Sequence, residues 1–400
     1  MSLTTIITLP ALGLVNALGH DTASIAQALF CGDTAGMVCE DGWLPQRAAR
    51  VGRARVADLP ALPASLSHYD SRNNRLLFAA LAQIEDEVRS AIERFGAHRV
   101  GVVLGTSTSG IYEGEAAIAH YTTHGALTPG FHYGRQELGD CARFVADALA
   151  LTGPAYTVST ACTSSAKAMV SAQQLIRAGL CDAVIAGGVD TLCRLTINGF
   201  SALEATTADL CNPMSANRRG INIGEGAALF LVSRKPADIA LLGAGESSDA
   251  HHISSPEPNG KGAEAAIRQA LAAAGAAPDD ISYLNLHGTA TPKNDEMESR
   301  AVARLFPKGV PCSSTKPLTG HTLGAAGATE LAFCWLALSH HNVDRRLPPH
   351  VWDGCADPTL PELNLVRTGD TIDRHPRRIM LSSSFAFGGS NCCLAIGDAP

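Results

Sequence analysis

The chain has 400 residues, of which 46% are hydrophobic and 17% are charged. This composition is that of an ordinary globular protein with enough apolar side chains for one large domain or two medium-sized ones. The formal net charge of −7 argues against a general nucleic-acid binder, which would carry a basic surface.

The N-terminal segment MSLTTIITLPALGLVNALG is apolar, but no basic region precedes it, and proline and glycine interrupt it. It is predicted to form a first buried strand and turn. No run approaches the ~20 uninterrupted apolar residues of a membrane span. The twelve cysteines include no CxxC pair. Without a secretory signal, we expect reduced thiols and a cytoplasmic protein.

Short β-rich runs alternate with alanine-rich helical runs along the rest of the chain, and no residue-level repeat is visible. The predicted strands cover residues 99–108, 154–160, 181–190, 227–233, 281–289, 377–389 and 391–398, and the predicted helices cover residues 74–96, 166–179, 262–275 and 325–341. Buried strands alternating with amphipathic helices predict an α/β layered fold. The segment SRKPAD (233–238) is the best candidate for a join, which predicts an N-terminal half over residues 1–235 and a C-terminal half over residues 236–400.

The segment TVSTACTSSAKAM (157–169) places Cys162 where a predicted strand changes into a predicted helix that ends near Gly179. A thiol in a first helical turn lies near unpaired N–H groups and the positive end of the helix dipole, which favour the thiolate. Free cysteines are often buried, so the alternative is a packed small apolar residue. The small residues over 161–165 favour a nucleophile, because they let a substrate approach and serve no large core.

Two histidines lie in glycine-rich turns. His287 ends a predicted strand in NLHGTATP, and His321 precedes a predicted helix in STKPLTGHTLGAAGATE, with Lys316 five residues earlier and Glu330 nine residues later. One such histidine would more often be structural, whereas two together favour a catalytic pair. No metal site is predicted, because the remaining candidates lack companion ligands at metal spacing and are interpreted as loop, surface or core residues: His251, His252, His340, His341, Cys392 and Cys393.

Five motifs together resemble one family, in its order and over nearly the whole chain. They are STACTSSAKAM (159–169), GEGAALFLV (224–232), LHGTATP (286–292), STKPLTGHTLGAAG (314–327) and SSSFAFGGSN (382–391). In these motifs the chain is similar to the β-ketoacyl-acyl carrier protein synthases, the elongating condensing enzymes of the thiolase superfamily. The resemblance implies an α/β thiolase fold, with two similar halves that each have a five-stranded mixed sheet, stacked as five α-β-α-β-α layers, and a dimer.

The resemblance also implies an acyltransferase reaction and its catalytic residues. Cys162 matches the acyl-accepting nucleophile, and His287 and His321 match the two histidines that stabilise the enolate formed when a malonyl thioester loses CO2. Lys316 matches the motif lysine and Glu330 the carboxylate after the GAAG turn, both in supporting roles. The alternative for this lysine is a structural ion pair with Glu330.

Further positions follow from the same resemblance. Phe387 matches the phenylalanine that gates the acyl pocket, and the N–H groups of Cys162 and Phe387 match the oxyanion hole. Thr289 and Thr291 match residues that hydrogen-bond the pantetheine arm. No bound cofactor is expected, because the substrates are carried on the 4′-phosphopantetheine of acyl carrier protein.

Two segments depart from the pattern of fatty-acid members. In GTSTSG (105–110), Thr108 falls beside the expected acyl pocket, although it could simply pack at a turn. In SRNNRLL (71–77) the usual lysines are missing, so the candidates for docking carrier protein are Arg72, Arg75 and Arg218, each of which could instead be merely solvated. Both segments resemble the branch that builds aryl polyene pigments. In that branch the enzyme pairs with a chain-length factor, so the dimer is predicted to be a homodimer or a heterodimer.

Three other functions share part of this pattern. A non-catalytic chain-length-factor-like subunit would be expected to have lost the nucleophile, which is present here. A thiolase would use a second catalytic cysteine near the C-terminus, where AFGGSN has none and Cys392 and Cys393 follow it. A hydrolytic cysteine enzyme would not require two histidines in separate motifs.

Overall fold

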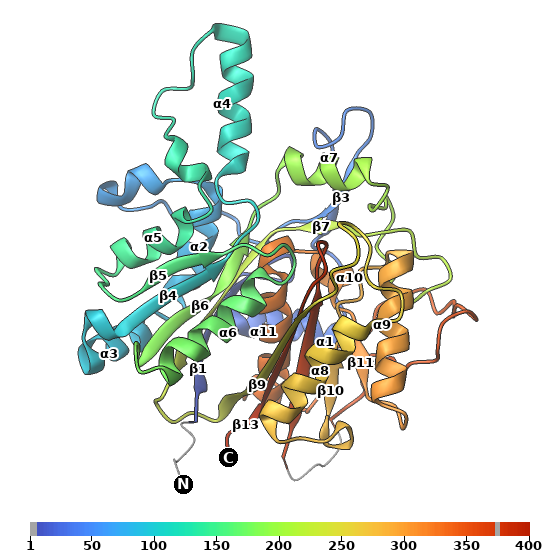
Figure 1. Cartoon of the computed structure of the whole chain (residues 1–400). Coiled ribbons are helices and arrows are strands. Elements are labelled where there is room, and N and C mark those ends of the chain that lie inside the picture. Colours follow the sequence, from blue (N-terminus) through green and yellow to red (C-terminus); the bar gives the residue numbers. More distant parts are fainter. Residues whose placement is uncertain (1–5, 373–376) are drawn as a thin grey trace.

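The computed structural model describes residues 6–372 and 377–400. Within these residues, ten strands form one sheet made of two sets of five (Figure 1). From the centre outward, the first set is β1 (Thr8–Val15), β8 (Gly226–Ser233), β6 (Ala183–Asp190), β4 (Val100–Gly105) and β5 (Ala155–Val158). In the same direction, the second set is β9 (Ile239–Ser248), β13 (Ser390–Asp398), β12 (Ile379–Phe385), β10 (Tyr283–Asn285) and β11 (Cys312–Ser313). The two sets meet at the pair Thr8 and Ala240 of β1 and β9.

The two sets have the same topology. In each, the strand that comes first along the chain lies innermost and the strand that comes third lies outermost. From the centre outward, the four strand pairings of each set are antiparallel, antiparallel, parallel and parallel. The structure therefore contains a duplicated unit that no residue-level repeat reveals.

Helices cover both sets and fill the space between them. The outer layer over the first set is α2 (Arg72–Ala82), α3 (Glu85–Phe95) and α5 (Asp140–Ala148). The middle layer, between the two sets, is α1 (Thr22–Cys31), α6 (Ser164–Arg177) and α11 (Ala326–Leu338). The outer layer over the second set is α8 (Lys261–Ala274) and α9 (Pro292–Leu305). Every residue of α11 is buried, as expected for a helix enclosed on all sides. The predicted five-layer arrangement is confirmed.

The remaining elements are a small sheet, three further helices and several 3-10 turns. The small sheet is formed by β2 (Met37–Glu40), β3 (Ala49–Gly52) and β7 (Ile223–Gly224). The further helices are α4 (Ile111–His124), α7 (Arg194–Ala202) and α10 (Lys316–Thr319). The short 3-10 turns cover Ala64–Tyr69, Ala97–Arg99, Tyr133–Gln136, Pro278–Asp280 and Leu323–Ala325. Helix α4 projects away from the body of the molecule (Figure 1). None of the helices in the described ranges is both long and apolar enough to span a membrane.

One expectation about elements was wrong, and one long central strand was not predicted. The single helix predicted over 74–96 is two helices, because the backbone leaves the helical conformation at Ile84 (φ −118°, ψ 11°). Next to this break, the side-chain amide of Gln83 bonds both the N–H and the C=O of Leu14, each at 3.1 Å. At Leu14 this edge of β1 has no strand neighbour, so the amide supplies the missing partners. Strand β9 was not predicted, since its glycines weaken a strand pattern. A Cβ at Gly245 would lie 2.0 Å from the carbonyl oxygen of Ala266 in α8, so close helix packing requires glycine there.

Candidate active site

Cys162 lies in a tight turn between β5 and α6. The preceding Ala161 has φ = 54°, in the left-handed region that non-glycine residues rarely adopt. The hydroxyl of Ser164 holds this turn, because it accepts from Thr160 N–H (2.9 Å) and donates to Ala161 C=O (2.6 Å). The helix begins at Ser164, so Cys162 immediately precedes the N-cap residue Thr163 rather than lying within the first turn.

Small residues bring three elements close together behind the nucleophile. A Cβ at Gly105 of β4 would lie 2.3 Å from the backbone nitrogen of Ser165, and one at Gly327 of α11 would lie 2.7 Å from Ala166 Cβ. The small residues after Cys162 were expected only to admit substrate and to serve no large core. In the structure they also pack densely within the middle layer.

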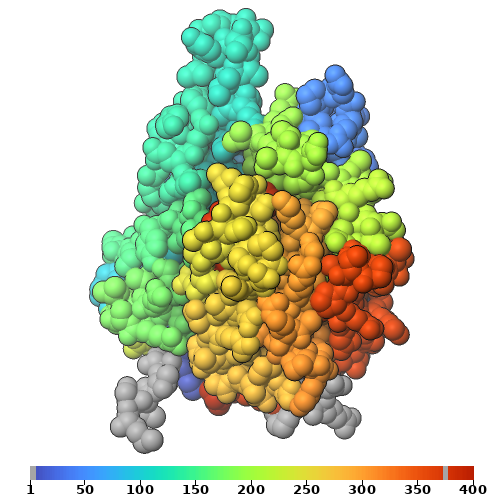
Figure 2. All heavy atoms as spheres, turned by 45° about the vertical axis from the view of Figure 1, so that its right-hand side comes forward, coloured from blue at the N-terminus to red at the C-terminus, as the bar shows by residue number. Residues whose placement is uncertain are grey.

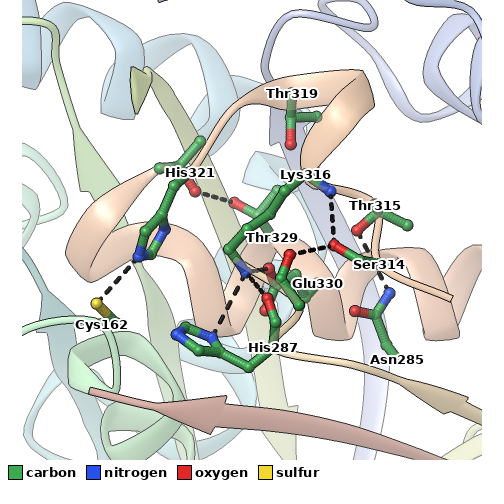
Figure 3. Close-up of polar contacts among 12 residues, drawn as sticks. Cys162, Asn285, His287, Ser314, Thr315, Lys316, Thr319, His321, Thr329 and Glu330 are labelled. Carbon is green, nitrogen blue, oxygen red and sulfur yellow. Dashed lines mark hydrogen bonds and ion pairs between the residues drawn. The ribbon is translucent and has the colours of Figure 1, made fainter. Parts of the chain in front are cut away.

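Both predicted catalytic histidines meet Cys162 in one buried site (Figure 3). His321 Nε2 lies 3.0 Å from Cys162 Sγ, and the rings of His287 and His321 are nearly perpendicular with centroids 5.5 Å apart. His321 is held by backbone bonds to Asn222 O (2.7 Å) and from Gly224 N–H (2.9 Å). Sulfur and imidazole are also zinc ligands, and suitable atoms of the three side chains lie within 4.8 Å of one another. The expectation of no metal stays an expectation.

Lys316 links the buried carboxylate to His287. Its ammonium donates to His287 C=O, lies 2.5 Å from Glu330 Oε1, and lies 3.5 Å from His287 Nδ1. Because an ammonium can only donate, His287 Nδ1 is the acceptor and the ring proton belongs on Nε2. The ion pair of the alternative interpretation is therefore present, and the same ammonium also contacts the histidine.

Two further buried carboxylates hold the His287 loop, and sequence reasoning missed both. Glu298 accepts from the backbone N–H groups of His287 and Gly288, each at 2.7 Å, and Asp295 accepts from Ala290 N–H at 3.1 Å. Burial is the main cause that raises the pKa of Glu298 to about 8 and that of Asp295 to about 6. Two acidic residues three positions apart, directly after LHGTATP, are the signal that could have revealed them.

Burial dominates the electrostatics of the site. It lowers the pKa of His287 and of His321 well below the usual value, and the nearby charge of Lys316 adds to this, so both rings are neutral. Burial also raises the pKa of Cys162 to about 11, although Lys316 and the N–H groups of Phe387 and Cys162 itself act in the opposite direction. The expected shift towards thiolate was therefore wrong for this state, in which Cys162 is a thiol.

The site opens outward through two adjoining cavities. The inner pocket is lined by Cys162 and both histidines and has only about 20 Å³ of free space. It is narrowed by Phe387, whose ring lies 5.7 Å from that of Phe200 in α7. An outer cavity of about 300 Å³ adjoins it, and five residues line both spaces: Ala205, Thr291, Asn294, Phe385 and Phe387. Phe387 thus lies where the two spaces meet, and its gating role stays a prediction.

The two predicted pantetheine-binding threonines line the inner pocket, with their hydroxyls 2.8 Å apart. Thr108 lines neither of these cavities. It is buried, and its N–H and hydroxyl both bond Asp190 Oδ1, at 2.7 Å and 2.6 Å. Packing at a turn, the alternative for Thr108, describes these contacts, and its role beside an acyl channel stays a prediction.

The three arginines predicted to dock carrier protein each have a carboxylate partner within the chain. The pairs, with their shortest N–O distances, are Arg72 with Glu225 (2.5 Å), Arg75 with Asp70 (2.5 Å) and Arg218 with Asp357 (2.5 Å). The side chain of Arg218 is only 9% exposed, and Glu225 is fully buried. Docking by these arginines stays a prediction, and it would require them to share or leave these partners.

Comparison with known proteins identifies relatives over the whole chain. Residues 70–237 match the family model for the N-terminal domain of β-ketoacyl synthases, and residues 239–349 match the model for the C-terminal domain. The chain is 30% identical to a 3-oxoacyl-[acyl-carrier-protein] synthase 2 of Coxiella burnetii, over 98% of both chains, and 33% identical to nodulation protein E of Rhizobium meliloti, over 74% of this chain and 75% of that protein.

Solved structures show the same relationship. A ketosynthase (ApeO) in complex with its chain length factor (ApeC), from Xenorhabdus doucetiae, superposes with a TM-score of 0.93 and 48% identity over 100% of this chain and 99% of that chain. A β-ketoacyl synthase from Burkholderia phymatum superposes with a TM-score of 0.83 and 26% identity, over 99% of this chain and 100% of that one. The chain therefore belongs to the β-ketoacyl synthase family of acyl-transferring condensing enzymes, with the thiolase fold that its five layers display.

Proposed function

We propose that the chain condenses a malonyl thioester with an acyl chain held on Cys162, releasing CO2 and extending the acyl chain by two carbons. The observation that carries this proposal is the meeting of one thiol and two neutral imidazoles in a buried pocket, reached through an outer cavity. Each of the two half-reactions uses these groups in a different way.

In the first half-reaction, Cys162 Sγ attacks the carbonyl carbon of an acyl thioester. His321 Nε2, at 3.0 Å from the sulfur, accepts the thiol proton as the new bond forms. We assign the oxyanion hole to the N–H groups of Cys162 and Phe387, and this is supported by the fact that both lower the pKa of the Cys162 sulfur. The tetrahedral species then expels the carrier thiolate, which takes up the proton, and leaves the acyl group on Cys162.

In the second half-reaction, a malonyl thioester loses CO2 and its bonding electrons pass to an enolate. The Nε2–H of His287, set by Lys316 at Nδ1, donates to the enolate oxygen. His321 is the second donor, in the Nε2–H tautomer that its neutral ring adopts once Cys162 is acylated and no longer offers a thiol proton. The enolate carbon attacks the acyl-Cys162 carbonyl, the carbon–sulfur bond breaks, and the Cys162 thiolate takes up a proton from solvent. Lys316 and Glu330 act as positioning residues and transfer no substrate proton.

We further propose that the substrates arrive on the 4′-phosphopantetheine of an acyl carrier protein and that the pathway is aryl polyene synthesis. The first inference is supported by relatives named 3-oxoacyl-[acyl-carrier-protein] synthase, and the second by the 48% identical ketosynthase that is paired with a chain length factor. No bound cofactor is needed, because the thiol and imidazoles supply the chemistry. A cytoplasmic location suits such substrates.

A dimer fits the surface of the molecule, and a heterodimer with a chain-length-factor-like homologue is the form we propose, with a homodimer as the alternative. The projecting α4 and the segment after it expose large apolar side chains: Tyr112, Ile118, Tyr121, Leu127 and Tyr133. Exposed apolar side chains gathered on one projection are typical of an interface. The division at residues 235 and 236 is also proposed, supported by family models that end at 237 and begin at 239.

The test is the intact mass of the wild type and of Cys162→Ala after incubation with a series of acyl-carrier proteins and then malonyl-carrier protein. We expect an acyl adduct in the wild type alone, discharged by malonyl-carrier protein into a longer β-ketoacyl product. Absence of any adduct, with the partner subunit present, would support the non-catalytic alternative. Discharge by water alone would support a thioesterase. A thiolase is disfavoured, because Cys162 is the one cysteine lining the inner pocket.

A further inference from the structure

His350, in the segment LPPHVWDG (347–354), is a further buried histidine to which neither half-reaction gives a role. Its side chain is only 5% exposed and lines neither of the two cavities at the active site. Its Nδ1 accepts from Ser314 N–H at 3.0 Å, so the ring proton lies on Nε2, which donates to Pro213 C=O at 3.0 Å. Burial lowers the pKa of His350 to about 4, so the ring is neutral near pH 7 and joins two backbone segments.

The first contact of His350 leads to the loop of His287 (residues 287–290) through Ser314. The hydroxyl of Ser314 donates to Gly288 C=O at 2.7 Å and accepts from Lys316 N–H at 3.4 Å (Figure 3). A Cβ at Gly288 would lie 2.4 Å from Ser314 Cβ, so the loop rests directly on this serine. The acceptor that His350 provides therefore holds a residue that contacts both the histidine loop and the backbone of the motif lysine.

The second contact of His350 leads to the other end of the same loop. Next to Pro213, Met214 has φ = 63°, in the left-handed region that only its surroundings can maintain. Met214 N–H donates to Asp295 Oδ2 at 2.7 Å, and Asp295 Oδ1 accepts from Ala290 N–H at 3.1 Å. The imidazole thus lies between two chains of hydrogen bonds that converge on the His287 loop from opposite ends.

The chain after His350 covers this arrangement from outside. Ser215 and Ala356 form a β-bridge, and Arg218 pairs with Asp357 at 2.5 Å. Figure 2 shows these two segments in contact on the surface, the lime-green one before β7 and the red-orange one after His350. Since the ring is buried and both of its nitrogens are paired, His350 can affect the reaction only through the loop that it holds.

We propose that His350 is a positioning residue for the second half-reaction, which keeps the Nε2–H of His287 aimed at the enolate oxygen by holding the His287 loop at both ends. The first half-reaction does not depend on it, because the turn of Cys162 is held by Ser164 and His321 is held by other backbone bonds. This assignment rests on the proposed condensing function and adds a residue that the two catalytic histidines do not contact.

The experiment measures two rate constants by rapid-quench intact mass: acylation of Cys162, and discharge of the acyl group by a malonyl thioester. His350→Phe keeps a ring but removes both hydrogen bonds. It should slow discharge by ~10²-fold, as for a misplacement of about 1 Å, and leave acylation unchanged. His350→Asn places an oxygen at the Nδ1 position and keeps the bond to Ser314, whereas His350→Gln places an N–H at the Nε2 position and keeps the bond to Pro213. Each should slow discharge by only ~10-fold, as for one lost bond.

A double variant tests the path through the serine. Ser314→Ala removes the hydroxyl that carries the first contact and should slow the same step. Added to His350→Phe, it should slow discharge by less than the product of the two single effects, because the two residues act through one chain of contacts. Fully multiplicative effects would overturn the proposed path.

Asn342→Ala is the matched control for loss of stability. Asn342 is also buried and makes three bonds of 2.8 Å in the loop after α11, to Ala337 C=O and to the C=O and N–H of Arg346. Its replacement should lower the free energy of unfolding and leave both rate constants unchanged. A control slowed like His350→Phe, or a His350→Phe variant slowed equally in both steps, would overturn the assignment, because the effect would then be general.

The remaining outcomes separate this assignment from the proposed function. If His350→Phe does not fold, the Asn and Gln variants, each with one bond intact, carry the test. Full discharge rates in both would overturn the positioning role alone. A wild type that is not acylated, or whose acyl group no malonyl thioester discharges, would overturn the proposed function and with it this assignment.

Discussion

Replacing Lys316 by methionine tests the buried ion pair and its link to His287 together. Burial raises the pKa of Glu330 from 4.5 to about 7, with Lys316 opposing the rise. At ~1.4 kcal/mol per pKa unit, ionising this carboxyl in the folded state costs about 3 kcal/mol. A raised folded-state pKa means that the folded chain binds the proton more tightly, so this contribution to stability is present below pH 4.5 and is lost as pH rises through about 7.

Lys316→Met removes the opposing charge, so the folded-state pKa of Glu330 rises further. At pH 8 we expect a loss of ~2–3 kcal/mol in unfolding free energy. The missing hydrogen bonds cost ~1–2 kcal/mol, and up to ~1.4 kcal/mol is added because the wild-type carboxyl is ionised at pH 8 whereas that of the variant stays protonated. At pH 6 the carboxyl is protonated in the variant and the loss should be smaller, about 1–2 kcal/mol for the missing hydrogen bonds. Lys316 also lowers the pKa of both histidines, so the contribution of Glu330 is isolated by comparing the single variant with one that lacks the carboxylate as well.

Urea unfolding at the two pH values measures this difference, with Lys316→Met/Glu330→Gln as the control. The double variant has no buried charge at this pair and should recover most of the stability. It should not recover the condensation rate, because no ammonium then holds the Nδ1 of His287 as an acceptor. A loss of equal size at pH 6 and pH 8, or a double variant with full condensation activity, would refute this reasoning.

Three further predictions follow from other contacts. His321→Ala should slow acylation of Cys162 by ~10²–10⁴-fold, because the proton acceptor is lost, whereas His287→Ala should be acylated normally and lose condensation. Quench-flow mass spectrometry separates the two steps, and equal defects of the two variants in both steps would contradict this division of roles. In the wild type, the raised pKa of Glu298, about 8, predicts a loss of stability as the pH rises from 4.5 to 8. Glu298→Gln should flatten this loss, at a cost of ~1–3 kcal/mol for the weakened bonds to the His287 loop. An unchanged pH profile of unfolding would count against this prediction. Thr108→Ile should shorten the accepted primers and lower the free energy of unfolding by ~1–2 kcal/mol, because the hydrogen bond to Asp190 is lost. An unchanged product-length profile would show that Thr108 does not line the acyl pocket.

Much of the fold was predictable from local patterns. The strand runs and the helix over 166–179 were recognised because apolar and β-branched residues repeat at strand or helix spacing, and the helix that follows Cys162 ends just before Gly179 as predicted. The contact of Gln83 beside the helix break was not predictable in this way. It depends on an open edge of β1 about 70 residues away in sequence, and a pattern within one segment carries no information about such a partner.

For the site, the sequence by itself determined which residue types are present: one cysteine and two histidines in small-residue turns, with a lysine and a glutamate nearby. Only the tertiary structure decided how they act. Burial makes Cys162 a thiol with His321 as its neighbour, and the contact of Lys316 with His287 decides which ring nitrogen carries the proton. Protonation depends on burial and on neighbouring charges, and both arise only when distant segments pack together.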